Sequence, residues 1–283
     1  MKLIVLIIVF LFFPFFVFSS SLGIAPLSRQ VEQGDIFVQE LYLNTEGKMV
    51  NAVEVSLSLP SFLKFQELGK GNSILSLWVE EPSIENNILS FSGGIPAGFG
   101  GEKGLLAKIV FKAETEGQGF LDLSGSKVFL NDGLGTEDNA FSQKARVVSL
   151  VGGGETNEWQ DILEQDKNPP EIFKIELKKD PLLFEGKYFI LFSTQDKQSG
   201  LDYYEVKEGE GDWQRATSPY LLQDQRQKGI IQVKAVDKAG NESIVSYQPR
   251  ELFFPYIIVS VLIILIAVIV LSFYFLRRWK RKY

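Results

Sequence analysis

Apolar and polar side chains alternate along much of the first half of the chain. In residues 52–59 every second side chain is apolar, beginning at Val53 and ending at Leu59, and polar residues stand between them. A period of two is typical of a strand with one buried face. Similar segments predict further strands over 36–43, 62–68, 88–91, 105–113, 120–123, 128–130 and 146–151. Short strands separated by turn residues indicate an antiparallel sandwich or barrel.

A second set of strand-like segments follows residue 168. The set comprises 172–177, 188–192, 203–206, 230–236 and 244–247. We expect a hairpin turn over 237–241, because Gly240 and Asn241 both tolerate positive φ. The pattern therefore predicts an all-β protein with two antiparallel β-sandwich domains.

The region between the two sets has a different composition. Three glycines at 152–154 end the first pattern, and residues 155–167 are polar except for Trp159, Ile162 and Leu163 at helical spacing. A short helix and a loosely docked linker both fit this spacing. The prolines at 169 and 170 favour extended structure before the second domain.

The two ends of the chain carry export and membrane signals. An apolar run over 3–18 follows Lys2 and precedes three serines, which is typical of a secretory signal peptide with cleavage after residue 21; an uncleaved anchor is the alternative. Residues 256–276 contain no charge and are long enough, as a helix, to cross a hydrocarbon core of about 30 Å. The basic tail at 277–283 marks the cytoplasmic side. We therefore expect a single-pass cell-membrane protein with its N-terminal part outside.

Composition narrows the range of functions. All 35 acidic residues lie between the two terminal segments, together with 23 basic residues, so this part carries a net charge of −12. Such a surface repels nucleic acid, although acidity is also an ordinary route to solubility. The chain has no cysteine and no histidine, which excludes disulfides, Ser-His-Asp and Cys-His catalysis, and histidine-containing zinc sites. A carboxylate-dependent glycosidase remains as the only catalytic alternative, and we expect no enzyme activity.

Residues 91–104, FSGGIPAGFGGEKG, contain six glycines and raise the question of a phosphate-binding loop. Gly98 and Gly100 match the start of G-x-G-x-x-G, but Lys103 occupies the position of the third glycine. The motif therefore fails, and we expect no nucleotide and no other cofactor.

Four segments of the first region form a characteristic series: VNAVEVSLSLP (50–60), FLKFQEL (62–68), ILSFSGGIPAGFGGEKGLLAKIVFKAE (88–114) and KVFLNDGLGT (127–136). Preceded by Gly34-Asp35, they resemble a cohesin domain, and the resemblance covers residues 22–151. It implies a jelly-roll-like sandwich in which FSGGIPAGFGG is a structural turn region. It also implies a dockerin-like protein partner, and the wider superfamily includes carbohydrate-binding modules. Cohesins often carry an acidic residue before the proline that ends the early strand, whereas Leu59 precedes Pro60 here. No dockerin-contacting residue is carried over.

The second region resembles bacterial immunoglobulin-like modules of surface proteins. The resemblance is carried by NPPEI (168–172), DKQSGLDYYEV (196–206), DWQRATSPYLL (212–222) and VKAVDKAGNES (233–243). Such modules act as spacers or adhesion units, and the fold alone does not identify a ligand.

Three residues are candidate ligand contacts: Trp78, Asn131 and Asp132. Trp78 is a flat ring suited to stacking on a sugar, and the alternative is a ring packed at the sandwich edge. Asn131-Asp132-Gly133, with 137–139, offers oxygen ligands, but the spacing does not match a calcium loop and a simple turn is the alternative. We expect no metal.

The sequence thus predicts six segments: signal peptide (1–21), cohesin-like sandwich (22–151), linker (152–168), immunoglobulin-like sandwich (169–250), juxtamembrane segment and transmembrane helix (251–276), and cytoplasmic tail (277–283). We expect a non-catalytic surface protein whose first domain recognises a protein partner or an extracellular polysaccharide. A structural envelope protein that self-associates is the alternative.

Overall fold

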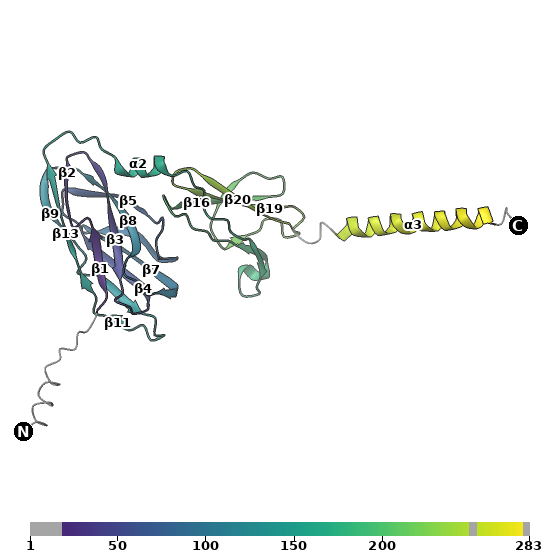
Figure 1. The fold of residues 1–283 in the computed structure, drawn as a ribbon, viewed down its shortest axis with the longest axis horizontal. Coiled ribbons are helices and arrows are strands. Elements are labelled where there is room, and N and C mark those ends of the chain that lie inside the picture. The colour runs from purple at the N-terminus through teal and green to yellow at the C-terminus, as the bar shows by residue number, and fades with distance from the viewer. Residues whose placement is uncertain (1–18, 249–253, 280–283) are drawn as a thin grey trace, which may run out of the picture. The chain divides into compact units, whose positions relative to one another are not determined.

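The computed structural model describes residues 19–248 and 254–279 (Figure 1). Residues 1–18 of the predicted signal peptide and 280–283 of the predicted basic tail lie outside the described residues. The chain divides into two compact units. The first comprises Met1–Lys167 and Asp196–Gly200, and the second comprises Asn168–Gln195 and Leu201–Tyr283.

The first unit is mainly β. Its described strands are β1 (Ser21–Ala25), β2 (Ser28–Glu32), β3 (Ile36–Asn44), β4 (Val50–Ser58), β5 (Leu63–Gly69), β6 (Leu77–Glu85), β7 (Ile88–Phe99), β8 (Gly104–Ala113), β9 (Gly117–Asp122), β10 (Lys127–Leu130), β11 (Glu137–Asp138), β12 (Phe141–Ser142) and β13 (Lys144–Leu150).

These strands form a sandwich of two sheets. One sheet has the order β12-β1-β3-β8-β5; in the other, β11-β10-β4-β9-β13-β2 form one path, and β7 pairs with both β4 and β6. One apolar cluster joins both sheets, with Phe37 and Leu41 from the first and Val55 and Leu89 from the second. Most pairs are antiparallel as expected, but β1 with β12 and β13 with β2 are parallel.

The glycine-rich stretch is a strand over most of its length, so the expected turn region is wrong for residues 91–99. β7 runs to Phe99, and only 100–103 connect it to β8. The strand requires glycine at position 93, because a Cβ there would lie only 3.0 Å from the carbonyl oxygen of Leu77 on β6. Close approach of β6 therefore explains this glycine.

Residues 155–167 contain a helix, α2 (Glu158–Gln165), which belongs to the first unit. The side chain of Asn157 caps it by accepting a hydrogen bond from the backbone N–H of Gln160 at 3.0 Å. Trp159 is buried against Val38 and Val110 on the five-stranded sheet. Of the two alternatives for this segment, the docked helix is the one observed, and the loosely docked linker is not.

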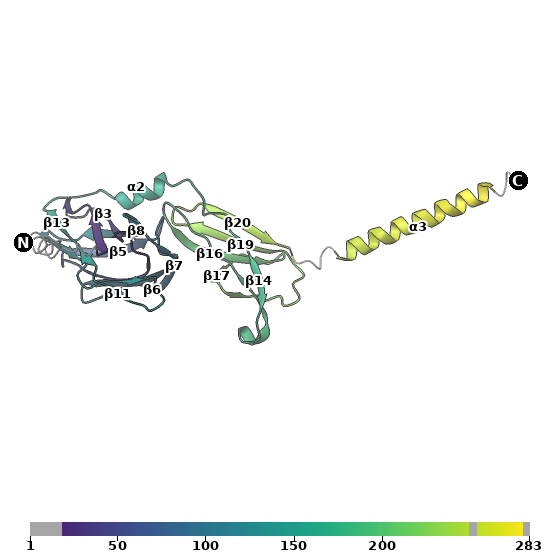
Figure 2. The ribbon, with the colours of Figure 1, turned by 60° about the horizontal axis from the view of Figure 1, so that its bottom comes forward.

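The second unit holds two smaller sheets (Figure 2). Its described strands and short 3₁₀ helix are β14 (Glu176–Lys179), η1 (Phe184–Gly186), β15 (Tyr188–Leu191), β16 (Leu201–Glu208), β17 (Gln214–Ala216), β18 (Tyr220–Leu221), β19 (Ile231–Asp237) and β20 (Glu242–Tyr247). The sheet orders are β14-β15-β18 and β17-β16-β19-β20. Ile190, Val206 and Val233 pack in one shared core. In the β19–β20 turn, Gly240 has φ +87° as expected.

A C-terminal helix, α3 (Phe254–Trp279), includes the uncharged segment 256–276. Judged on the residues that the structure describes, none of the helices combines the length and the apolar character needed to cross a membrane.

Candidate binding surface

The strands β10, β4, β7 and β6 present a continuous outer face on the first unit. Val53, Val55 and Leu57 of β4 are buried in the core, so the residues between them point to the opposite face. β7 lies antiparallel to β4 on one side and to β6 on the other. Directly paired residues share a face of a sheet, so the register defines rows of side chains that cross the strands.

Four rows result from this register. The first contains Ser58, Ile88 and Glu85, and the second contains Ser56, Ser90 and Ser83. The third contains Lys127, Glu54, Ser92 and Glu80, and the fourth contains Phe129, Ala52, Gly94 and Leu77. We call the last three, in that order, the serine row, the charged row and the apolar row. Adjacent strands are about 4.8 Å apart, so four strands span roughly 14 Å.

The charged side chains of the charged row are paired with other members of the same row. Lys127 Nζ lies 3.7 Å from Glu54 Oε2, and the hydroxyl of Ser92 donates to Glu80 Oε2 at 3.3 Å. Exposed ion pairs of this kind contribute little to stability. The serine row adds only hydroxyls. At its edge, Ser126 Oγ donates to the backbone carbonyl of Ser56 at 3.2 Å and accepts from its N–H at 2.9 Å. The face therefore combines a band of small hydroxyl side chains with larger charged and apolar side chains in the neighbouring rows, and this mixture suits contact with another protein surface.

Trp78 lies on the core side of β6, opposite Gly93, and not on this outer face. Its ring packs against Phe91 with a centroid distance of 5.6 Å. The ammonium of Lys70 lies 4.4 Å from its centroid and is held by Glu81 at 2.7 Å. The geometry is thus that of a ring packed at the edge of the sandwich, and contact with a sugar stays a prediction.

Asn131 and Asp132 form the turn that follows β10. Asp132 Oδ1 accepts a hydrogen bond from the backbone N–H of Leu134 at 2.8 Å, and a hydrogen bond with Thr136 lowers the pKa of Asp132. The amide oxygen of Asn131 accepts from Asn51 at 3.4 Å. These bonds give the two residues a local role in the turn, and contact with a ligand stays a prediction.

Asp138, which the sequence groups with Asn131 and Asp132, is buried. Its carboxylate accepts from Lys48 Nζ at 2.6 Å and from the backbone N–H of Ser20 at 3.0 Å. Burial opposes ionisation, but these hydrogen bonds outweigh it and hold the pKa of Asp138 below its ordinary value. Asp138 therefore ties Ser20, a buried residue within the predicted signal peptide (1–21), to the sandwich.

Two buried carboxylates in the first unit, Asp166 and Asp196, were not anticipated from the sequence. Oxygens of the two lie within 4.8 Å of each other. The backbone N–H of Ser199 donates to Asp166 at 2.9 Å, and that of Gly200 donates to Asp196 at 2.7 Å. The sequence did not indicate that these two acids are close in space, because 29 residues separate them along the chain.

The comparisons with known proteins give structural similarity only. No family model matches the chain, and no curated protein matches it. A non-cellulosomal cohesin from Archaeoglobus fulgidus is 15% identical, with a TM-score of 0.40, covering 47% of this chain and 92% of that one. A cohesin module of a Clostridium perfringens family 33 glycoside hydrolase is 13% identical, with a TM-score of 0.40, covering 47% and 98%. A type I cohesin–dockerin complex from Clostridium thermocellum is 12% identical, with a TM-score of 0.37, covering 47% and 100%. These three solved structures are each described as containing a cohesin module.

Proposed function

We propose that the first unit is a non-catalytic docking module for a protein partner of dockerin-like character. The partner binds to the outer face of β10, β4, β7 and β6. The observation that carries this proposal is the serine row, which forms a band of small side chains across β4, β7 and β6, between the row of Ile88 and the charged row. A band of small residues lets a partner approach the strands closely and exclude water there, as stable protein interfaces require.

The chemistry of the chain supports a binding role. Histidine and cysteine are absent from the sequence. On the proposed face, the carboxylates of Glu54 and Glu80 are engaged by Lys127 and Ser92.

We assign the remaining segments supporting roles. The second unit acts as an immunoglobulin-like spacer, and the uncharged segment 256–276 with its basic tail anchors the chain in the cell membrane with both units outside. The support for the anchor is the sequence itself, which places five basic residues directly after the uncharged segment.

Self-association is the second candidate function. β6 pairs only with β7 among the described strands. It exposes three large apolar side chains, Leu77, Val79 and Ile84, and Val79 is 67% exposed. A strand edge of this kind is a known template for pairing with another chain. Pro82 and the irregular register with β7 oppose such pairing, so docking of a different protein is the function we favour.

Polysaccharide binding is less well supported. It relied on Trp78, whose ring packs against Phe91 and lies beneath the ammonium of Lys70.

The test uses the full chain, purified in detergent and immobilised. Solubilised envelope proteins and purified dockerin modules are passed over it, and retained proteins are identified by mass spectrometry. We expect saturable retention that Ser90→Arg removes, because a long cation then rises from the centre of the serine row. Ser246→Arg, on an exposed strand position of the second unit, is the matched control and keeps binding. Equal retention by both variants contradicts the proposed face. Retention of the chain's own second copy alone, with concentration-dependent mass in sedimentation, supports self-association.

A further inference from the structure

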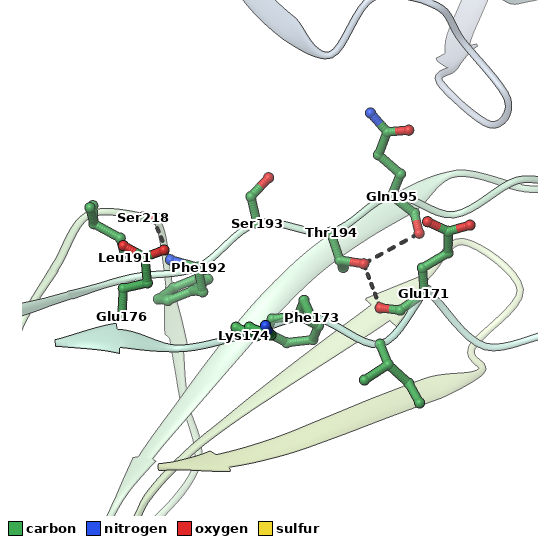
Figure 3. A pocket seen from close by; sticks show the side chains of 11 residues that line it. Glu171, Phe173, Lys174, Glu176, Leu191, Phe192, Ser193, Thr194, Gln195 and Ser218 are labelled. Atoms are coloured by element: carbon green, nitrogen blue, oxygen red, sulfur yellow. Dashed lines mark hydrogen bonds between the residues drawn. The ribbon is translucent and has the colours of Figure 1, made fainter. Parts of the chain in front are cut away.

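The chain segment that leads into β14 and the segment that leaves β15 separate from each other and then meet again. Glu176 pairs with Leu191 at the start of the β14–β15 ladder. At the other end of these two segments, the backbone N–H of Glu171 donates to the carbonyl of Gln195 at 2.9 Å. Between these two points, in the described second unit, no backbone hydrogen bond joins residues 172–174 to residues 192–194. The opening forms a pocket of about 660 Å³ (Figure 3).

The floor of this pocket is aromatic and held in place. Phe173 and Phe192 line it and are both buried in the core of the unit. Each ring meets the edge of Tyr204, at centroid distances of 6.1 and 4.9 Å. The Tyr204 hydroxyl accepts from the backbone N–H of Thr194 at 2.8 Å and donates to the Thr194 carbonyl at 3.3 Å. These contacts fix one wall, so the pocket is preformed.

The rim is polar and contains groups of both signs. Ser193, Gln195 and Glu171 extend the same way from the two walls in Figure 3. Lys174 and Glu176 complete the rim with one positive and one negative charge. The Thr194 hydroxyl donates to the Glu171 carbonyl at 2.5 Å and closes one end. The rim therefore offers donors and acceptors in close alternation.

We propose that this pocket binds a neutral sugar, one or two rings long. Backbone pairing at both ends limits the length of the opening, because four extended residues span only about 13 Å. The rim carries one positive charge, on Lys174, and two negative charges, on Glu171 and Glu176, so it both donates and accepts as the hydroxyls of a neutral sugar require. The exposed side chain of Ile172 and the buried rings of Phe173 and Phe192 give the pocket an apolar part, and apolar surface with a few convergent polar groups is the usual composition of a small-molecule site. This site lies in the second unit and is independent of the proposed docking face.

The test measures sugar binding to the full chain, purified in a detergent without a sugar headgroup. The probes are glucose, galactose, mannose, N-acetylglucosamine and their homodisaccharides, followed by saturation-transfer NMR and calorimetric titration. We expect at least one probe to bind with a dissociation constant of roughly 1 mM or below. Ser193→Trp fills the opening and weakens binding about tenfold or more, whereas Ser246→Trp, outside the pocket, leaves it unchanged.

A second pair of variants keeps the test decisive if Ser193→Trp misfolds. Lys174→Ala removes a donor from the rim at an exposed position and weakens binding, whereas Lys187→Ala, an exposed lysine of the same unit outside the pocket, does not. The proposal is overturned if no probe binds the folded chain. It is also overturned if bound sugar is equally tight in Lys174→Ala and Lys187→Ala.

Discussion

Ser56 on β4 lies directly opposite Ser90 on β7, on the outer face of the eight-stranded sheet. Ser83 on β6 continues the same row. Because none of the three side chains rises far above the sheet, a partner can approach the strands closely at this point. The proposed docking function depends on this relationship between neighbouring strands.

Two phenylalanines of the first unit should contribute very differently to its free energy of unfolding. Phe111 is fully buried and contacts Phe37 with a centroid distance of 5.8 Å, whereas Phe120 is 57% exposed. Phe111→Ala removes buried apolar surface and leaves a cavity, so we expect a loss of about 3–5 kcal/mol in the free energy of unfolding. Phe120→Ala is the control and should cost far less. Urea denaturation followed by circular dichroism measures both, and equal losses would contradict the observed core.

Two glycines with positive φ should differ in their tolerance of alanine. A Cβ on Gly34, at φ +105°, would lie 2.5 Å from the backbone oxygen of Gly154, whereas Gly133, at φ +73°, has open space. Gly133→Ala meets only conformational strain of about 1 kcal/mol. Gly34→Ala adds a clash with backbone, so we expect a total loss above about 2 kcal/mol. Thermal unfolding of the two variants tests the difference, and an equal decrease in Tm would argue against this close approach.

The buried carboxylate of Asp138 should make stability depend on acid pH. Its pKa is held below the ordinary value by Lys48 and Ser20, against the effect of burial. A carboxyl group whose folded pKa is depressed stabilises the fold above its unfolded pKa of about 3.9, and the contribution is lost as pH falls through the folded pKa.

Asp138→Asn should therefore be less stable than the native chain at pH 7, and the gap should narrow below about pH 4. Glu137→Gln, at the exposed neighbouring position, controls for the loss of one negative charge. Urea unfolding at a series of pH values gives the result. A gap that stays constant down to pH 3 would show that the carboxylate contributes through shape alone.

Helix α2 should depend on one side chain for its docking. Trp159 is 5% exposed, packs on Val38 and Val110, and donates its indole N–H to the carboxylate of Glu67. We expect Trp159→Ala to cost roughly 3 kcal/mol in the unfolding of the first unit and to speed tryptic cleavage at Lys167. Gln165→Ala, on an exposed position of the same helix, should change neither quantity. Unchanged proteolysis in Trp159→Ala would mean that the helix is held by other contacts.

Strands with a clear contrast between their two faces were predictable from the sequence. The segment predicted at 52–59 is β4 (Val50–Ser58), and the one at 105–113 is β8 (Gly104–Ala113). β6 was not predicted, because it is exposed on both faces and contains Pro82, so it carries no alternating pattern. β6 is a strand because it pairs with β7, and the local sequence pattern does not reveal which segments pair. The first predicted strand of the second unit, 172–177, was placed too early. β14 begins at Glu176, where pairing with β15 begins, and the local pattern does not show that pairing.

The candidate surface was only partly accessible to sequence reasoning. The polar face of β4 was predicted, including Ser56. Its place beside Ser90 depends on the β4–β7 register, and the place of Ser83 beside Ser90 depends on bulges between β6 and β7. Trp78 was selected for its residue type, and its direction follows from its pairing with Gly93. A shift of one residue in that register would have turned the ring to the outer face. The side chain's role thus depends on tertiary structure and not on its neighbours in sequence.

Amide hydrogen exchange of the full chain, with and without the protein that it retains, tests the docking face most directly. We predict slower exchange in β4, β7 and β6 when the partner is bound, and unchanged exchange in β3 and β8 of the opposite sheet. Protection confined to β3 and β8, or to the second unit, would contradict the proposal that the serine-centred face is the docking surface.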